Sequence, residues 1–181
     1  MRKIVAGLFV SLDGVVEAPE KWQFPYFNDE MGQALGSAMA ASDTLLLGRR
    51  TYQEFAAFWP KQSGNVPFAE QLNAMPKVVV SSTLRSAEWQ PATLINGEAA
   101  RAVAALKRQS GRNILVNGSA TLVRWLLREN LLDELSLLVC PVVVGEGWRL
   151  FEGWSDRLPL QVADSTTFST GVLSVTYRPA V

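Results

Sequence analysis

The stretch Asn113–Asn130, NILVNGSATLVRWLLREN, is the part of the chain that decides the fold. It begins with a short apolar run, Ile114–Val116, which has the length of a buried strand. The turn Asn117–Ser119 follows, and apolar residues then recur at helical spacing: Leu122, Val123, Leu126 and Leu127. A strand that turns directly into a helix leaves backbone N–H groups and the positive end of the helix dipole free. The turn is therefore either an anion site or an ordinary helix start, with glycine and serine as turn and N-cap residues.

Two earlier strands are predicted to end in similar polar turns. The strand Thr44–Leu47 runs through Gly48-Arg-Arg-Thr51 into a helix, and the strand Lys77–Val80 ends in Ser81-Ser-Thr83. Two adjacent arginines at a helix start suit a phosphate, because the guanidinium fork matches its oxygens. The alternative is a solvated, charged turn.

The remaining pattern alternates strands with helices. Further strands are predicted at Lys3–Leu12, Thr93–Asn96, Leu135–Val144 (interrupted by Pro141), Leu160–Thr167 and Val172–Arg178, and further helices at 29–41, Phe68–Asn73 and Glu98–Gln109. Because Val78–Val80 and Val142–Val144 are wholly apolar, the pattern favours an α/β fold with a mainly parallel sheet covered on both faces and an antiparallel hairpin at one edge. Ligands of such sheets bind beyond the carboxyl ends of the strands. The three polar turns would meet there, which favours a dinucleotide site.

Composition narrows the function. The 181 residues suit one domain, 1–181, and the 17 basic against 17 acidic side chains do not point to nucleic acid. We find no signal peptide and no membrane span, and the single cysteine, Cys140, excludes an internal disulfide, so a cytoplasmic protein is expected. Cys140 lies in an apolar run, which predicts a buried side chain rather than a nucleophile.

The chain contains no histidine. This removes histidine-based triads, histidine general bases and nearly every common zinc site, so no catalytic metal is predicted. If the protein is an enzyme, its chemistry must come largely from a cofactor, or from carboxylates, hydroxyls and arginines.

Two features near the N-terminus could serve a substrate. Asp13 follows the first strand and is either a turn-forming Asp-Gly residue or a carboxylate at the mouth of a cleft. The irregular loop 17–28 is rich in aromatic residues, among them Trp22 and Phe27. These rings either pack the loop down or wall a ring-shaped ligand.

The chain resembles the dihydrofolate reductase superfamily in three segments and in their order. These are Gly48-Arg-Arg-Thr-Tyr52, the strand end Ser81-Ser82, and the strand that turns through Gly118 into a helix. One branch of this superfamily is more similar to the chain in four further segments. They are SLDG at 11–14, LDEL at 132–135, PVVVGEG at 141–147 and Leu150-Phe151. That branch is the reductase domain of the riboflavin-biosynthesis deaminase–reductase and its stand-alone bacterial relatives. The likeness covers nearly the whole chain, without a deaminase domain.

The resemblance implies a three-layer fold with NADPH bound across the strand ends. It places Gly48, Arg49, Arg50 and Thr51 at phosphates, and Ser81 and Ser82 by the adenosine ribose and its 2′-phosphate. It places Asn117, Gly118, Ser119, Ala120, Thr121 and Leu122 at the pyrophosphate and nicotinamide. Asp13, as the catalytic carboxylate, and Trp22, Phe27 and Asp29 would face the substrate.

Two departures separate the chain from folate reductases. On a count without gaps, the helical acid that grips a pterin falls on Gly32, and the threonine that supports it falls on Leu138. Asn117-Gly118 also replaces the paired glycines of the dinucleotide turn, where the family has a cis peptide.

We therefore expect an NADPH-dependent reductase of a pyrimidine or pterin-like small molecule, with aminouracil ribosyl phosphate reduction as the archetype. Dihydrofolate reduction and a non-catalytic NADPH-binding role are the alternatives. The apolar Leu173, Val175 and Tyr177 on the C-terminal hairpin predict a homodimer through an isologous surface.

Overall fold

The computed structural model describes residues 1–180. Its strands are β1 (Ile4–Ser11), β2 (Ser42–Gly48), β3 (Lys77–Val80), β4 (Ala92–Ile95), β5 (Asn113–Val116), β6 (Glu134–Cys140), β7 (Leu160–Thr167) and β8 (Leu173–Pro179). Its α-helices are α1 (Asp29–Ala40), α2 (Arg49–Phe58), α3 (Ala69–Ala74), α4 (Ala99–Arg108) and α5 (Ala120–Arg128). Short 3-10 turns lie at Pro19–Lys21, Phe24–Tyr26 and Trp59–Lys61. None of the helices in this described part is long and apolar enough to cross a membrane.

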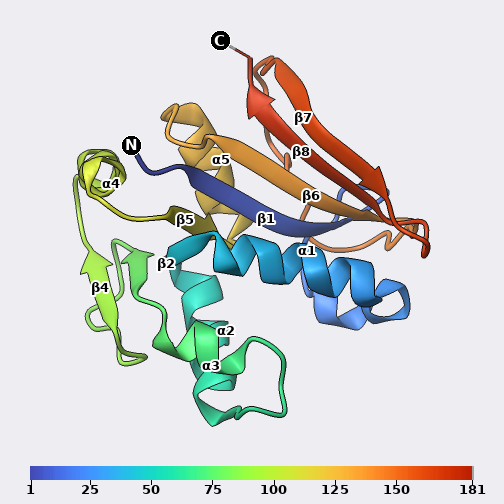
Figure 1. Ribbon diagram of the computed structural model, residues 1–181. Helices are drawn as coiled ribbons and strands as arrows, with labels where there is room; N and C mark the ends of the chain where they lie inside the picture. The colour runs from blue at the N-terminus through green and yellow to red at the C-terminus, as the bar shows by residue number, and fades with distance from the viewer. Residues whose placement is uncertain (181) are drawn as a thin grey trace.

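All the strands form one sheet, in the order β4-β3-β2-β5-β1-β6-β8-β7 (Figure 1). The six strands from β4 to β6 are parallel, whereas β8 runs antiparallel to β6 and β7 runs antiparallel to β8. The prediction of a mainly parallel sheet with an antiparallel C-terminal hairpin is therefore confirmed. Because β2 lies between β3 and β5, the carboxyl ends of these three strands are neighbours.

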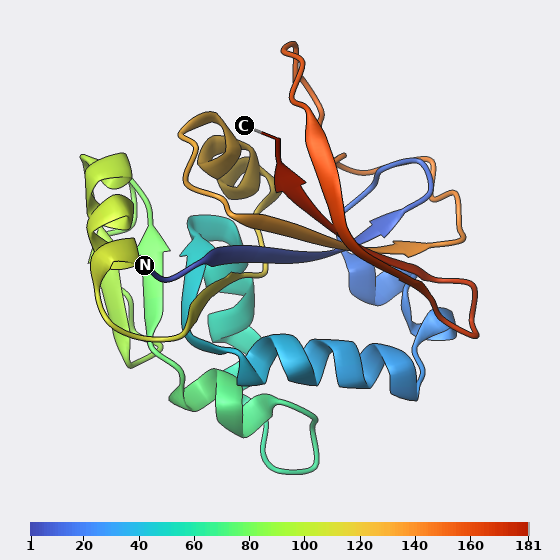
Figure 2. The ribbon, with the colours of Figure 1, turned by 45° about the horizontal axis from the view of Figure 1, so that its top comes forward.

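Helices cover both faces of the parallel part (Figure 2). The alternation of side chains along β2 shows the two layers: Leu46 packs with α4 and α5, while Leu45 and Leu47 pack with α1, α2 and α3. The four apolar residues of α5 that the sequence singles out are all at most 5% exposed. Their burial fixes α5 on the sheet, and it thereby fixes the turn that precedes it.

The predicted strand Leu135–Val144 does not resume after its interruption at Pro141, because β6 ends at Cys140. Pro141 has no N–H to donate to a ladder, and Val142 N instead donates to Cys140 O (2.8 Å) in a turn. The run Val142–Val144 is therefore not a buried strand, and the Val143 side chain is 67% exposed. This turn carries the chain back toward β1, where Leu12 N donates to Val142 O (2.8 Å).

The C-terminal hairpin projects beyond the helical layers (Figure 2). Its outer strand is β7, so the predicted surface residues Leu173, Val175 and Tyr177 lie on β8, one strand in from the edge. Leu173 is 44% exposed, whereas Tyr177 packs against the core beneath α5. The apolar surface on this face is therefore smaller than the sequence pattern indicates.

Candidate functional site

Two helix N-termini lie side by side at the carboxyl ends of β2 and β5. Gly48 N donates weakly to Gly118 O (3.4 Å), and Ser119 caps α5 by accepting from Leu122 N (3.3 Å). A Cβ on Gly48 would lie 2.8 Å from Ser119 Oγ, and a Cβ on Gly118, at φ +132°, would lie 2.9 Å from Thr51 Oγ1. Only glycine permits this approach, and it brings two sets of free helical N–H groups to one place.

The two arginines at the start of α2 point to opposite sides of this place. Arg49 Nη1 donates to Thr83 Oγ1 (3.0 Å), beyond the end of β3. Arg50 turns the other way, and its guanidinium carbon lies 3.8 Å from the centre of the Trp148 ring. Both arginines are exposed. The site is therefore a basic strip along the strand ends, with one positive charge toward β3 and the other toward the loop after β6.

The serines after β3 have different surroundings. Ser81 is 8% exposed, and its Oγ accepts from Thr83 N (3.2 Å) and Leu84 N (2.9 Å), so it shapes the turn. Ser82 is exposed and, with Thr83, lies on the side of Arg49. Of the two predicted serines, Ser82 is the one whose hydroxyl is open to a ligand.

The turn before α5 holds an unsatisfied polar atom. Asn117 Oδ1 is buried and accepts no hydrogen bond among the described residues. The Gly118–Ser119 peptide bond that follows is cis, one residue later than the Asn117-Gly118 pair. Ala120 is half-buried and Thr121 exposed at the open end of α5, but Leu122 is 5% exposed and belongs to the core. The Leu122 side chain packs inward because the helical spacing turns it toward the core, and its place at the pyrophosphate and nicotinamide stays a prediction.

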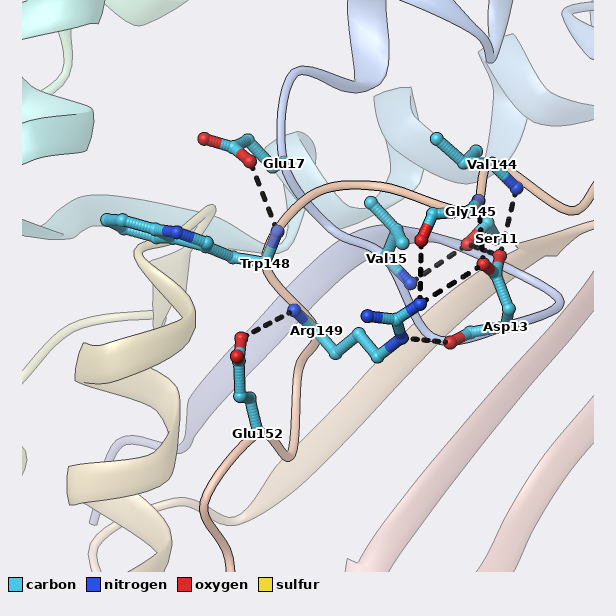
Figure 3. A network of polar contacts seen from close by, with 9 residues as sticks. All are labelled: Ser11, Asp13, Val15, Glu17, Val144, Gly145, Trp148, Arg149 and Glu152. Carbon is cyan, nitrogen blue, oxygen red and sulfur yellow. Dashed lines mark hydrogen bonds and ion pairs between the residues drawn. The ribbon is translucent and has the colours of Figure 1, made fainter.

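Asp13 is enclosed by hydrogen-bond donors (Figure 3). Its Oδ1 accepts from Ser11 Oγ (2.6 Å) and Val144 N (3.0 Å), its Oδ2 accepts from Gly145 N (2.8 Å), and Arg149 Nη2 lies 3.6 Å from Oδ2. The Ser11 hydroxyl first, and then the two backbone N–H groups, hold the pKa of this carboxyl far below its usual range. Asp13 therefore stays ionised at neutral pH.

The same network joins two loops that lie far apart in the sequence. Arg149 Nε donates to Asp13 O (3.0 Å), Leu150 N to Gly14 O (3.0 Å) and Val16 N to Trp148 O (2.9 Å). These bonds bind the segment after β1 to the segment after β6. A hollow of about 340 Å³ lies beside them, lined by Val10, Asp13, Gly14, Leu137, Arg149, Leu150, Phe151 and Glu152.

The predicted substrate residues divide between two places. Trp22 is tied to the first loop, because its Nε1 donates to Glu17 O (3.0 Å). Phe27 is 43% exposed and lies beside Gly32 on α1, and Asp29 is the exposed first residue of that helix. The structure does not bring Phe27 or Asp29 to Asp13 by any contact.

Glu30 is the second acid of α1, and it is not free to bind a ligand in the manner of a folate reductase. Its Oε2 accepts from Ser169 N (2.7 Å), Ser169 Oγ (2.6 Å) and Asn28 Nδ2 (2.7 Å). These donors, Ser169 foremost, lower the pKa of the Glu30 carboxyl. The acid thus ties α1 to the hairpin turn, and the buried position of this first helical turn is filled by Met31.

Sequence reasoning missed two parts of the site. Trp148 and Arg149 follow Gly147 in an irregular loop, and no local pattern shows that they reach α2 and β1. A second hollow, of about 550 Å³, is lined by the start of α4 (Glu98, Ala99, Ala100 and Arg101) and by Trp125 of α5. Trp125 lies between the apolar positions of α5, so the helical spacing by itself indicates a surface residue.

Solved structures share this fold. A proposed riboflavin biosynthesis protein from Shewanella sp. PV-4 aligns over 100% of both chains, with a TM-score of 0.79 and 23% identity. Dihydrofolate reductase from Enterococcus faecalis, solved with NADP(H), aligns over 99% of this chain and 97% of its own, with a TM-score of 0.66 and 14% identity. At these identities, the likeness establishes a dihydrofolate reductase-like fold.

Sequence comparison is more specific. The uncharacterized protein YyaP of Bacillus subtilis (strain 168) is 30% identical over 183 residues, which cover 98% of this chain and 95% of YyaP. The family model of the RibD C-terminal domain matches residues 2–174. Since this match spans β1 to β7 and both helix N-termini of the site, the chain belongs to the RibD C-terminal domain family, a riboflavin-biosynthesis type of reductase family.

Proposed function

We propose that the protein is an NADPH-dependent reductase that transfers a hydride to a pyrimidine or pterin-like small molecule. The observation that carries this proposal is the pair of abutting helix N-termini at Gly48 and Gly118, flanked by Arg49 and Arg50. Helical N–H groups and guanidinium groups are the donors that phosphates prefer. The solved relative with NADP(H) has the same fold.

The residues present fit such a cofactor. Arg49, with Ser82 and Thr83 nearby, suits the 2′-phosphate, and Arg50 and Thr51 suit the pyrophosphate. The hollow at Trp125 offers an aromatic wall to the adenine ring. Asn117 Oδ1 is a buried acceptor without a donor, and the carboxamide N–H₂ of a nicotinamide is a donor that would satisfy it.

The bound cofactor would supply the hydride, and the protein would bind, orient and exclude water. Asp13 already accepts from three donors and is held in its ionised form, so it is poorly suited to pass a proton to substrate. We infer that Asp13 contributes as a positioning residue, by fixing the loops on either side of the 340 Å³ hollow. The substrate would enter at this end of the basic strip, between the Asp13 network and the aromatic loop of Trp22.

The site supports the reduction of dihydrofolate less well than the reduction of a pyrimidine. A pterin ring is gripped by a free carboxylate on the first helix, but Glu30 is bound to the hairpin turn and Asp29 is exposed.

We also propose a homodimer in which the hairpin face with Leu173 and Val175 packs against its copy. The β7 residues Gln161–Thr167 are exposed and the outer edge of β7 is unpaired within the sheet, so a symmetric contact would cover it. Light scattering at micromolar concentration measures this, and a monomer mass would exclude it.

The function is tested by two measurements on the purified chain. NADPH and NADH are titrated to obtain dissociation constants, and NADPH oxidation is followed with aminouracil, pterin and dihydrofolate substrates. Binding with turnover of a pyrimidine or pterin supports the proposal. Binding without turnover across the panel supports a non-catalytic NADPH-binding protein, and absence of binding refutes both.

A further inference from the structure

The Trp148 ring contacts the Arg50 guanidinium. The guanidinium carbon lies 3.8 Å from the ring centre, and within residues 1–180 Arg50 has no hydrogen bond or ion pair. We propose that Trp148 is a positioning residue for Arg50, which holds the guanidinium in place for a phosphate of the cofactor. This inference rests on the proposed function, since it assumes that Arg50 binds NADPH.

The geometry of a stacked arginine supports this role. The five N–H donors of a guanidinium lie in its plane, so stacking on an aromatic face uses the face and leaves the donors free. By contrast, Arg49 donates to Thr83 and Arg149 donates to Asp13 O and Gly145 O. Arg50 is thus the arginine of this site whose donors are all available to a ligand.

The backbone of Trp148, from which the ring projects, is held by the network of Figure 3. Trp148 N donates to Glu17 Oε2 (3.1 Å), and its carbonyl accepts from Val16 N (2.9 Å). The preceding Gly147 has φ +116°, and a Cβ there would lie 2.9 Å from the Val15 side chain, so the loops meet closely. Figure 3 shows the indole extending from this network away from Asp13.

An exposed arginine loses rotamer freedom when it binds a phosphate, and a ring that already holds the guanidinium removes part of that cost. A cation–π contact at an exposed site corresponds to about a two- to fivefold change in affinity. The Asp13–Arg149 network would then act on the cofactor through Trp148, although Asp13 itself touches no phosphate.

The test is a double-mutant cycle with NADPH as the ligand. Dissociation constants are measured by calorimetric titration at one fixed salt concentration for wild type, Trp148→Leu, Arg50→Ala and the double variant. Trp148→Phe is the conservative rescue, because it keeps an aromatic face. Trp154→Leu is the matched control, since Trp154 stacks on Arg128 (4.8 Å) at the far end of α5.

We expect Trp148→Leu to weaken NADPH binding about two- to fivefold, and Trp148→Phe and Trp154→Leu to bind as wild type does. In the Arg50→Ala background, Trp148→Leu should cause no further loss. Equal losses in both backgrounds would mean that Trp148 is merely structural and would overturn the inference. An unchanged or tighter constant for Trp148→Leu would also overturn it while leaving the proposed function intact. A wild-type chain that binds no NADPH removes both.

Discussion

Replacing Arg49 with alanine should abolish most of the preference for NADPH over NADH. The two cofactors differ only in the 2′-phosphate, so discrimination must come from groups that reach it. The Arg49 side chain extends toward the end of β3, where its Nη1 donates to Thr83 Oγ1. The exposed Ser82 lies in the same turn. Arg50 leans toward Trp148, on the other side of the α2 N-terminus. On the proposed function, we therefore expect the two arginines to bind different phosphates of the cofactor.

The expected magnitude follows from the exposure of Arg49. A charge-assisted hydrogen bond contributes about 1.5–3 kcal/mol, which is roughly ten- to 150-fold in affinity. Arg49 is exposed, and solvent and salt screen its charge, so the lower end applies. Wild type should bind NADPH about tenfold more tightly than NADH, and Arg49→Ala should bring the two constants close together.

The assay is a set of titrations of both cofactors against wild type, Arg49→Ala and Arg50→Ala at one salt concentration. Arg50→Ala is the matched control, because it removes an adjacent arginine and should weaken both cofactors by a similar factor. If Arg49→Ala weakens NADH as much as NADPH, then Arg49 holds the shared pyrophosphate and the assignment is refuted. If wild type shows no preference, no group in the chain reads the 2′-phosphate.

Three further predictions concern stability and loop order. Lys77 is 1% exposed and burial lowers its pKa to about 8 from 10.5, so the unfolded state binds the proton more tightly. The free energy of unfolding should therefore rise between pH 8 and 10.5, by at most about 3 kcal/mol, and urea titrations of Lys77→Met should lack that rise. Gly118→Ala should lower the free energy of unfolding in urea by about 1–3 kcal/mol, because residue 118 has a positive φ and the added Cβ would meet Thr51 Oγ1. Gly97→Ala is the control, since Gly97 also has a positive φ but has open space around it. Equal losses of stability in the two variants would rule out the contact with Thr51 as the cause. Asp13→Asn should lower the urea midpoint and raise hydrogen exchange at Val144 or at Gly145, since the N–H₂ that replaces one carboxylate oxygen cannot accept from an N–H group. Unchanged exchange with full turnover would show that the network is dispensable.

Much of the fold can be predicted from the sequence because its determinants are local. The apolar spacing in Asn113–Asn130 defines β5, the turn and α5 within a few residues, and the runs at Thr44–Leu47 and Lys77–Val80 mark β2 and β3. Parallel strands place their carboxyl ends on one edge, so the meeting of Gly48 and Gly118 follows from chain order and packing. The same helical spacing turns the Leu122 side chain into the core, and the predicted place of this residue beside the cofactor stays a prediction.

Only the tertiary structure decided the contacts between segments that are far apart in the chain. Pro141 ends β6 early, and the resulting turn delivers Val144 and Gly145 N–H groups to Asp13 across more than a hundred residues. Whether Asp13 is a free carboxylate or a fully bonded one depends on those donors, which no pattern around residue 13 reveals. The Arg50–Trp148 stack likewise joins α2 to the loop after β6. Local periodicity reports which face of an element is buried, whereas the partner of a polar or charged side chain is set by the folded path of the whole chain.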